Sequence, residues 1–406
     1  MLDSSQKNVR RIYLFMRGGL SFLLNMIFIA SSIYQITTAG LSPLQLVLVG
    51  TVLEASVFLF EIPTGIVADV YSRKLSILIG FALIGLGFVL EGSFPFFLPI
   101  LVAQVLWGVG YTFTSGATQA WVTDELGPDG EALTAKLFLR ASQVSSLAAV
   151  GGIAAGSLLG LLRINLPIVL GGALLVALSL LLAAWMPETG FTPTPQGERS
   201  SWQQMGHIFR QGIGMLRRRP ALGRILAIGL FYGLYSEGYD RLSAKLMLDH
   251  LDFPGGWPPV VWFGALRIVS LLLAVAAVEW VRRHGKLERP GQSAHAMFAA
   301  TLVLVICLLA FAVSPLFGVT ALLMTAISVC RSVAAPLYDA WVNQKLDSNV
   351  RATVISMSGQ VDAFGQIAGG PLVGAIGNLS VRLALAVTGF ILSPALWLLR
   401  GNRSEA

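Results

Sequence analysis

Long apolar stretches separated by short polar segments recur along the whole chain. A helix needs about 20 apolar residues to cross the roughly 30 Å hydrocarbon core of a bilayer. Twelve stretches reach that length, so the pattern predicts an all-α integral membrane protein. The predicted spans are 12–36, 44–68, 75–92, 97–121, 138–162, 166–186, 221–246, 257–281, 293–313, 315–342, 351–377 and 379–399.

One polar segment interrupts this series between the sixth and seventh spans. It begins at Pro187 with turn-forming residues, and Ser200 to Leu216 then carries apolar residues at helical spacing before the basic run Arg217–Arg219. We expect an irregular linker followed by an amphipathic helix on the anionic inner leaflet, or else a solvated linker helix. The predicted domains are a six-helix bundle at 1–186, a cytoplasmic linker at 187–220 and a second six-helix bundle at 221–406.

Two distant segments of the chain resemble each other. Ala120-Trp121-Val122 is matched by Ala340-Trp341-Val342, 220 positions later, and Gly152 is matched by Gly369. This repeat joins the fourth and fifth spans to the tenth and eleventh. It predicts two pseudo-symmetric six-helix halves, an arrangement in which transporters place their substrate site near the midplane between the halves.

Composition and charge agree with a membrane protein. Hydrophobic residues make up 55% of the chain and charged residues 12%, against about 25% charged in soluble domains. This composition excludes a soluble enzyme carrying one anchor, a disulfide scaffold and a disordered chain. The 28 Lys and Arg exceed the 21 Asp and Glu, but the basic residues gather in alternate loops, and the loops around Thr38, Ser93 and Pro254 hold none. The positive-inside rule therefore places both termini and the linker in the cytoplasm, and nucleic acid is not an expected partner.

The loop after the second span carries a spaced motif. Gly65 is followed four residues later by Asp69 and four further by Arg73-Lys74. This motif resembles the signature of the major facilitator superfamily, where it latches the two halves on the cytoplasmic side. With twelve spans and the repeat, the resemblance covers essentially the whole chain. It implies the major facilitator fold and a functional monomer in the lipid bilayer, without a cofactor.

Two further segments, 60–65 and 236–242, are similar to bacterial tetracycline- and macrolide-type drug–proton antiporters. This resemblance implies a multi-pass protein of the bacterial cytoplasmic membrane that exports a hydrophobic or amphipathic small molecule in exchange for protons. The sequence departs from that branch at Gln104, where those antiporters carry an arginine. The alternatives are a proton-coupled uptake carrier, a non-transporting sensor and a lipid-modifying enzyme. We expect no enzyme and no metal site, because the sequence shows no phosphate loop, catalytic triad or metal-ligand spacing.

Charged residues within spans mark candidate functional positions, because each costs at least about 2.5–3.5 kcal/mol in the bilayer core. Glu54 and Glu61 are seven apart, on one helix face, and a buried carboxyl can bind and release a proton. Glu61 precedes Pro63, so a hydrogen bond to the opened helix is its alternative role. Asp240 and Asp362 are the proton-coupling candidates of the second half.

Other in-span charges are candidates for gating ion pairs. Glu237 and Arg241 can pair at i,i+4, although a charge cluster at the membrane surface is the alternative. By helical rise, Arg267 and Asp362 both lie near the midplane, where one could compensate the other, whereas Arg331 has no obvious partner at its depth.

Polar and aromatic side chains within spans supply the expected lining of a substrate cavity, with helix–helix hydrogen bonding as the alternative for each. They are Asn25, Gln104, Tyr111, Gln143, Tyr232, Tyr235 and Gln360.

Overall fold

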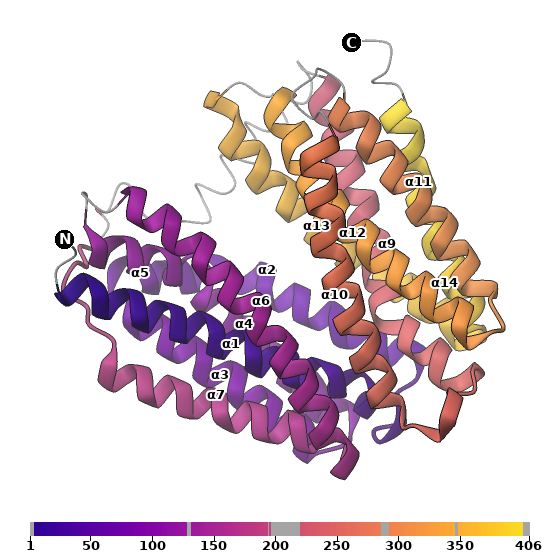
Figure 1. Ribbon diagram of the computed structural model, residues 1–406, viewed down its shortest axis with the longest axis horizontal. Helices are drawn as coiled ribbons and strands as arrows, with labels where there is room; N and C mark the ends of the chain where they lie inside the picture. Colours follow the sequence, from indigo (N-terminus) through magenta and orange to yellow (C-terminus); the bar gives the residue numbers. More distant parts are fainter. Residues whose placement is uncertain are drawn as a thin grey trace. The chain divides into compact units, whose positions relative to one another are not determined.

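The computed structural model describes residues 4–127, 131–193, 195, 220–285, 292–345 and 348–400 (Figure 1). Every predicted span is helical, and the fourth is divided at Gly116, whose φ is 73°. The helices are α1 (Ser4–Thr37), α2 (Pro43–Val70), α3 (Arg73–Ser93), α4 (Phe97–Thr114), α5 (Ala117–Leu126), α6 (Glu131–Leu162), α7 (Leu166–Trp185), α9 (Pro220–His250), α10 (Pro259–His284), α11 (Gln292–Val313), α12 (Phe317–Lys345), α13 (Ser348–Leu379) and α14 (Val381–Arg400). The amphipathic helix expected at 200–216 lies outside the described residues.

Ten helices in the described ranges are long and apolar enough to cross a membrane, with α4 and α5 taken as one. The two predicted spans outside this group are α9 and α13. Both carry charged residues along their length, including Glu237, Asp240 and Arg241 on α9 and Asp362 on α13. These two helices pack against each other, so two spans that carry charged residues lie side by side.

The chain divides into two compact units. Unit 1 comprises Met1–Gly40 and Val52–Met205, and unit 2 comprises Leu41–Thr51 and Gly206–Ala406. The beginning of α2 therefore packs with the helices of unit 2, whereas the sequence placed all of α2 in the first bundle.

The same helix pairings occur in both units (Figure 1). In unit 1, α1 packs on α6 and α7, and α3 packs on α4 and α7. In unit 2, α9 packs on α13 and α14, and α11 packs on α12 and α14. The order of pairings along the chain is thus duplicated, as the sequence repeat predicts.

Matched residues of the repeat occupy matched environments. A Cβ added at Gly152 would lie 2.1 Å from the carbonyl oxygen of Phe22, and one added at Gly369 would lie 2.3 Å from that of Leu234. In each unit, the glycine therefore lets the fifth span approach the backbone of the first. This small-residue packing is typical of helix association in membranes.

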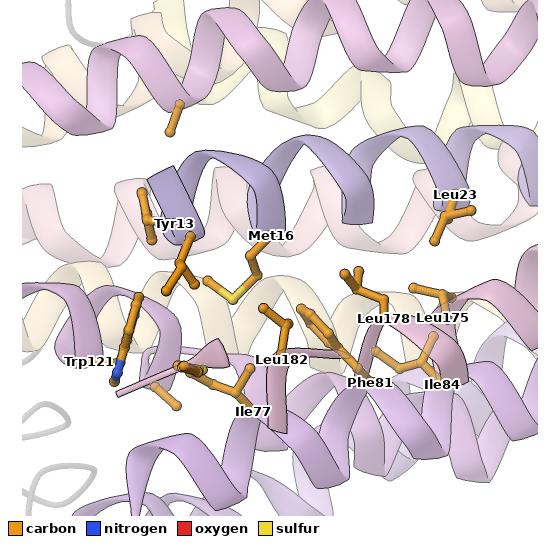
Figure 2. Packing of buried hydrophobic residues seen from close by; sticks show 14 of the residues in the cluster. Tyr13, Met16, Leu23, Ile77, Phe81, Ile84, Trp121, Leu175, Leu178 and Leu182 are labelled. Atoms are coloured by element: carbon orange, nitrogen blue, oxygen red, sulfur yellow. The ribbon is translucent and has the colours of Figure 1, made fainter. Parts of the chain in front are cut away.

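The core of unit 1 lies where α1, α3 and α7 meet. Figure 2 shows side chains of these helices pointing toward one another, with Trp121 of α5 at one end. Because the hydrophobic effect contributes little between helices in lipid, close van der Waals packing is the main stabilising contribution here. The labelled residues of the three helices are Tyr13, Met16, Leu23, Ile77, Phe81, Ile84, Leu175, Leu178 and Leu182.

Candidate functional site

Unit 2 contains a cavity lined mainly by α9, α12 and α13, with Met297 from α11. Its volume is about 480 Å³. Pockets with apolar and aromatic walls and a few charged groups are typical of small-molecule sites. The lining residues are Gly229, Tyr232, Tyr235, Ser236, Asp240, Met297, Arg331, Ala334, Ala335, Tyr338, Asp339, Val342, Ser358, Gly359, Asp362 and Gln366. Five of the predicted site residues meet here: Tyr232, Tyr235, Asp240, Arg331 and Asp362.

An ion pair lies on the wall of this cavity. Arg331 of α12 binds the carboxylate of Asp240 on α9 through both terminal nitrogens, with 2.8 Å between Nη2 and Oδ2. The guanidinium carbon also lies 5.9 Å from the ring centroids of both Tyr235 and Tyr239, within cation–π range. The expectation that Arg331 lacks a partner is wrong, because the span predicted to end at 246 continues to His250, and Asp240 therefore lies further from the end of the helix than the predicted bounds imply.

Asp362 of α13 lines the same cavity and is not a member of that ion pair. Gln366 Nε2, one helical turn away, donates a hydrogen bond to Asp362 Oδ2 over 2.9 Å. The expected compensation by Arg267 is wrong: among the described residues no ion pair joins the two, and Arg267 is exposed on α10. The Asp362 carboxyl is thus held by a neutral amide, an arrangement that leaves it available to a cation or a proton.

Hydrogen bonds fix two of the tyrosine rings of the cavity. The hydroxyl groups of Tyr232 and Thr301 lie 2.8 Å apart. The Tyr338 hydroxyl donates to the carbonyl oxygen of Ile225 over 3.0 Å and lies 2.6 Å from the Ser358 hydroxyl. Rings held in this way present rigid aromatic surfaces to a ligand.

The predicted pair of Glu237 and Arg241 is confirmed. Arg241 Nε lies 2.8 Å from Glu237 Oε1, and Glu237 is 4% exposed. The pair packs against Gly50 in the segment of α2 that belongs to unit 2: a Cβ added at Gly50 would lie 1.3 Å from Glu237 Oε1. Only glycine leaves room for this pair at that position.

The acids predicted for α2 differ in their surroundings. Glu54 is partly buried, and Glu61 is exposed. The Thr64 hydroxyl donates to the carbonyl oxygens of Phe60 and Glu61, over 2.8 and 3.3 Å. The Thr64 side chain therefore makes the hydrogen bond to the helix backbone around Pro63. The sequence analysis gave this bond as the alternative role of Glu61.

The polar residues predicted to line a cavity in the first half are spread over several helices. Asn25 Nδ2 donates to the carbonyl oxygen of Ser21 within α1, over 2.9 Å. Tyr111 and Gln143 are exposed on α4 and α6, whereas Gln104 is 1% exposed. In unit 2, Gln360 is partly buried on α13 and does not line the cavity.

The motif between α2 and α3 is part of a polar network in unit 1. Arg73 Nε lies 2.6 Å from Asp124 Oδ2 of α5, a partner that the sequence did not predict. Glu188 accepts hydrogen bonds from the Ser72 hydroxyl and the Lys74 backbone N–H, over 2.6 and 2.8 Å. Asp69 is partly buried near the end of α2, and nothing contacts a Cβ built at Gly65. The network joins the start of α3 to α5 and to the segment after α7.

Several residues of these sites escaped sequence reasoning. Tyr338, Ser358 and Gln366 line the cavity. Ser358 and Gln366 lie one helical turn either side of the predicted Asp362 on α13, a spacing that was a usable signal. Tyr338 lies on α12, and its contact with α13 could not be read from spacing within one helix. Glu91 is completely buried in unit 1. It lies one residue before the predicted end of its span, where a charge suggests contact with water, so it drew no attention.

The fold and its sites indicate the class of protein to which the chain belongs, the polytopic membrane transporters. A sequence model of the Major Facilitator Superfamily matches residues 13–291. An uncharacterized MFS-type transporter of Bacillus subtilis (strain 168), YxaM, is 22% identical over 337 residues, covering 82% of this chain and 80% of the relative. The chain belongs to the Major Facilitator Superfamily.

Solved structures agree with this assignment. The crystal structure of the nucleoside transporter NupG matches with a TM-score of 0.73 and 13% identity, covering 98% of this chain and 99% of that one. A bacterial homolog of the human lysosomal transporter Spinster, in an inward-facing and unoccupied conformation, matches with a TM-score of 0.73 and 14% identity over 99% and 98% of the two chains. At this identity the likeness establishes the fold.

Proposed function

We propose that this protein is a secondary active transporter that exports an amphipathic small molecule in exchange for protons. The observation that carries the proposal is the cavity of unit 2, whose aromatic walls surround the carboxyl group of Asp362. Tyrosine rings offer apolar faces to a planar or hydrophobic ligand and hydroxyl groups to its polar parts. Such a site suits a molecule with both kinds of surface.

The arrangement of charges supports exchange with protons. Asp240 is already bound by Arg331, whereas Asp362 is bound by the neutral amide of Gln366. A proton or a cationic group of the substrate would each neutralise Asp362, and the two would therefore compete. Competition for one carboxyl gives obligatory exchange, because each ligand biases the same conformational equilibrium.

Glu54 is the proposed proton carrier of the first half. It lies in α2, in the part of that helix that belongs to unit 1, and is partly buried. Glutamine at position 54 would keep the shape of the glutamate side chain and remove the group that binds the proton. Glu54→Gln should therefore uncouple transport from protons while leaving the protein folded.

The test is drug susceptibility in an efflux-deficient bacterial host, across a panel of amphipathic compounds. We expect wild type to raise resistance to at least one compound and Asp362→Asn and Glu54→Gln to lose most of that gain. Asp252→Asn is the matched control, because Asp252 is an exposed loop acid and should behave as wild type. Equal expression of all four proteins is checked by immunoblot.

Three outcomes would contradict the proposal. If no compound distinguishes expressing cells from empty cells, export of amphipathic molecules loses its support. Accumulation of a labelled compound under an inward proton gradient would instead indicate an uptake carrier. Normal transport by Glu54→Gln would remove the role assigned to Glu54.

A further inference from the structure

Unit 1 contains a buried polar cluster around Glu91. Glu91, in the last turn of α3, is 0% exposed. Its Oε1 accepts hydrogen bonds from the Ser31 hydroxyl and Gln35 Nε2 of α1, over 2.5 and 2.9 Å. Its Oε2 accepts one from Gln104 Nε2 of α4, over 3.0 Å. Three helices thus direct polar side chains at one carboxyl group.

Two oxygen atoms in this cluster have no hydrogen-bond partner. They are Gln104 Oε1 and Tyr34 Oη, in residues that are 1% and 2% exposed. Tyr34 lies three residues after Ser31 on α1, so the two side chains share the helix face from which Ser31 reaches Glu91. A buried polar atom left unpaired costs about 1–3 kcal/mol, so a native structure that retains two of them calls for an explanation.

The ends of two helices add negative potential at the same place. α1 ends at Thr37, which puts Ser31 and Tyr34 in its last two turns, and α3 ends at Ser93, two residues after Glu91. A helix C-terminus carries roughly half a negative charge, which favours nearby cations. The cluster therefore combines a carboxyl group, unpaired oxygen atoms and two helix C-termini.

We propose that this cluster binds one alkali cation of the size of sodium. We name it the Glu91 site: Ser31, Tyr34, Gln35, Glu91 and Gln104. Carboxylate, hydroxyl and amide oxygens are the ligands that hard cations prefer. One cation can accept lone pairs from Glu91, Gln104 Oε1 and Tyr34 Oη together, whereas a proton on Glu91 would supply a single donor.

The charge of the site favours a monovalent ion. Within the described ranges there is no group of three or more His, Cys, Asp or Glu that could hold a metal ion. The Glu91 site has one carboxyl group among neutral oxygens, which balances a single positive charge. The sequence predicted no metal site because it offered no cluster of charged ligands, and this site is built mainly from neutral ones.

Gln104 provides a second way to examine the charge balance. Its Nε2 already donates a hydrogen bond to Glu91 Oε2, so the residue at this position contacts the carboxyl group directly. A guanidinium group at this position would supply positive charge to Glu91 through the chain itself. Gln104→Arg should therefore replace the bound cation, as Glu91→Gln should remove the need for one.

The experiment follows thermal unfolding of the purified full chain by tryptophan fluorescence. Sodium, potassium and choline chloride are compared at equal ionic strength and pH. We expect sodium to give a saturable rise in melting temperature of roughly 2–4 °C over choline. Glu91→Gln and Gln104→Arg should lose this rise, and Glu91→Gln should melt in choline at least as high as wild type does.

Glu125→Gln is the matched control, because Glu125 accepts hydrogen bonds from Thr189 and Gly190 at the end of α5 and should keep the sodium response. The proposal is overturned if wild type melts identically in sodium and choline, or if Glu91→Gln retains the full rise. A melting temperature that responds to pH but not to sodium would also overturn it, in favour of a proton. None of these measurements requires a transported substrate, so they stand apart from the test of export.

Discussion

Arg331 and Asp240 form a two-nitrogen ion pair between α12 and α9, although they lie 91 positions apart in the sequence. The pair is flanked by the rings of Tyr235 and Tyr239. It therefore fixes the spacing of two helices and presents a neutralised charge to the cavity. A planar guanidinium is needed for both interactions.

The pair gives a first prediction about stability. Asp240→Asn should lower the free energy of unfolding by about 1–2 kcal/mol, less than the 3–5 kcal/mol for a fully buried pair, because both side chains are partly exposed. Arg331→Lys should lose the two-nitrogen geometry while keeping the charge. Thermal unfolding of the two single variants and the double variant measures the coupling, and strictly additive effects would contradict an energetic pair.

Gly50 gives a second prediction. Gly50→Ala would place a methyl group on the carboxylate of Glu237 and separate it from Arg241. Because Glu237 is buried, we expect a loss of about 1–3 kcal/mol, as for overpacking. Gly318→Ala in α12 is the matched control, since nothing contacts a Cβ there, and it should be neutral or slightly stabilising. The cost of Gly50→Ala should shrink in a Glu237→Ala background, and an undiminished cost would place the clash elsewhere.

Glu188 gives a third prediction, for the network at the start of α3. Its carboxylate binds Ser72 and the N–H group of Lys74 at a helix N-terminus, where negative charge is stabilising. Glu188→Ala should lower the melting temperature by an amount equivalent to about 1–2 kcal/mol. Glu188→Gln should recover part of this, because it keeps an acceptor without the charge. The assignment is wrong if Glu188→Ala melts like wild type in low salt.

The helices could be predicted from the sequence because each one must be long enough to cross the hydrocarbon core of the bilayer. Apolar runs must span the hydrocarbon core, and each predicted run lies in helix, although α1 begins at Ser4 and α6 at Glu131, before their predicted starts at 12 and 138, and the fourth run is divided at Gly116. Ion pairs within one helix could also be predicted from the sequence. Glu237 and Arg241 are four residues apart, and 3.6 residues per turn bring such side chains together. The length of an apolar run and the spacing of residues within one helix are both local features of the sequence.

Contacts between helices could not be predicted from the sequence in the same way. By helical rise, Asp240 lies about 15 Å from the C-terminal end of α9, and Arg331 lies about 21 Å from the N-terminal end of α12, so an error of four residues in a predicted end was enough to separate them. Glu91 shows the same limit. Its burial depends on α1 and α4 covering the end of α3, although polar residues near the same ends of three neighbouring spans were a signal that could have revealed it.

Tyr338 gives the last prediction, which separates a role in ligand binding from a role in helix packing. Its hydroxyl bridges Ile225 of α9 and Ser358 of α13 beside the cavity. Tyr338→Phe keeps the ring and removes these bonds, so we expect about 0.5–1.5 kcal/mol of lost stability together with weaker binding of a transported compound. Tyr71→Phe is the matched control, because Tyr71 is 70% exposed in the turn after α2, and it should change neither quantity. Thermal unfolding and a fluorescence titration with a compound identified in the susceptibility panel measure the two effects. If Tyr338→Phe melts lower but binds that compound as tightly as wild type, the hydroxyl group stabilises the helices alone, and its place in the substrate site is refuted.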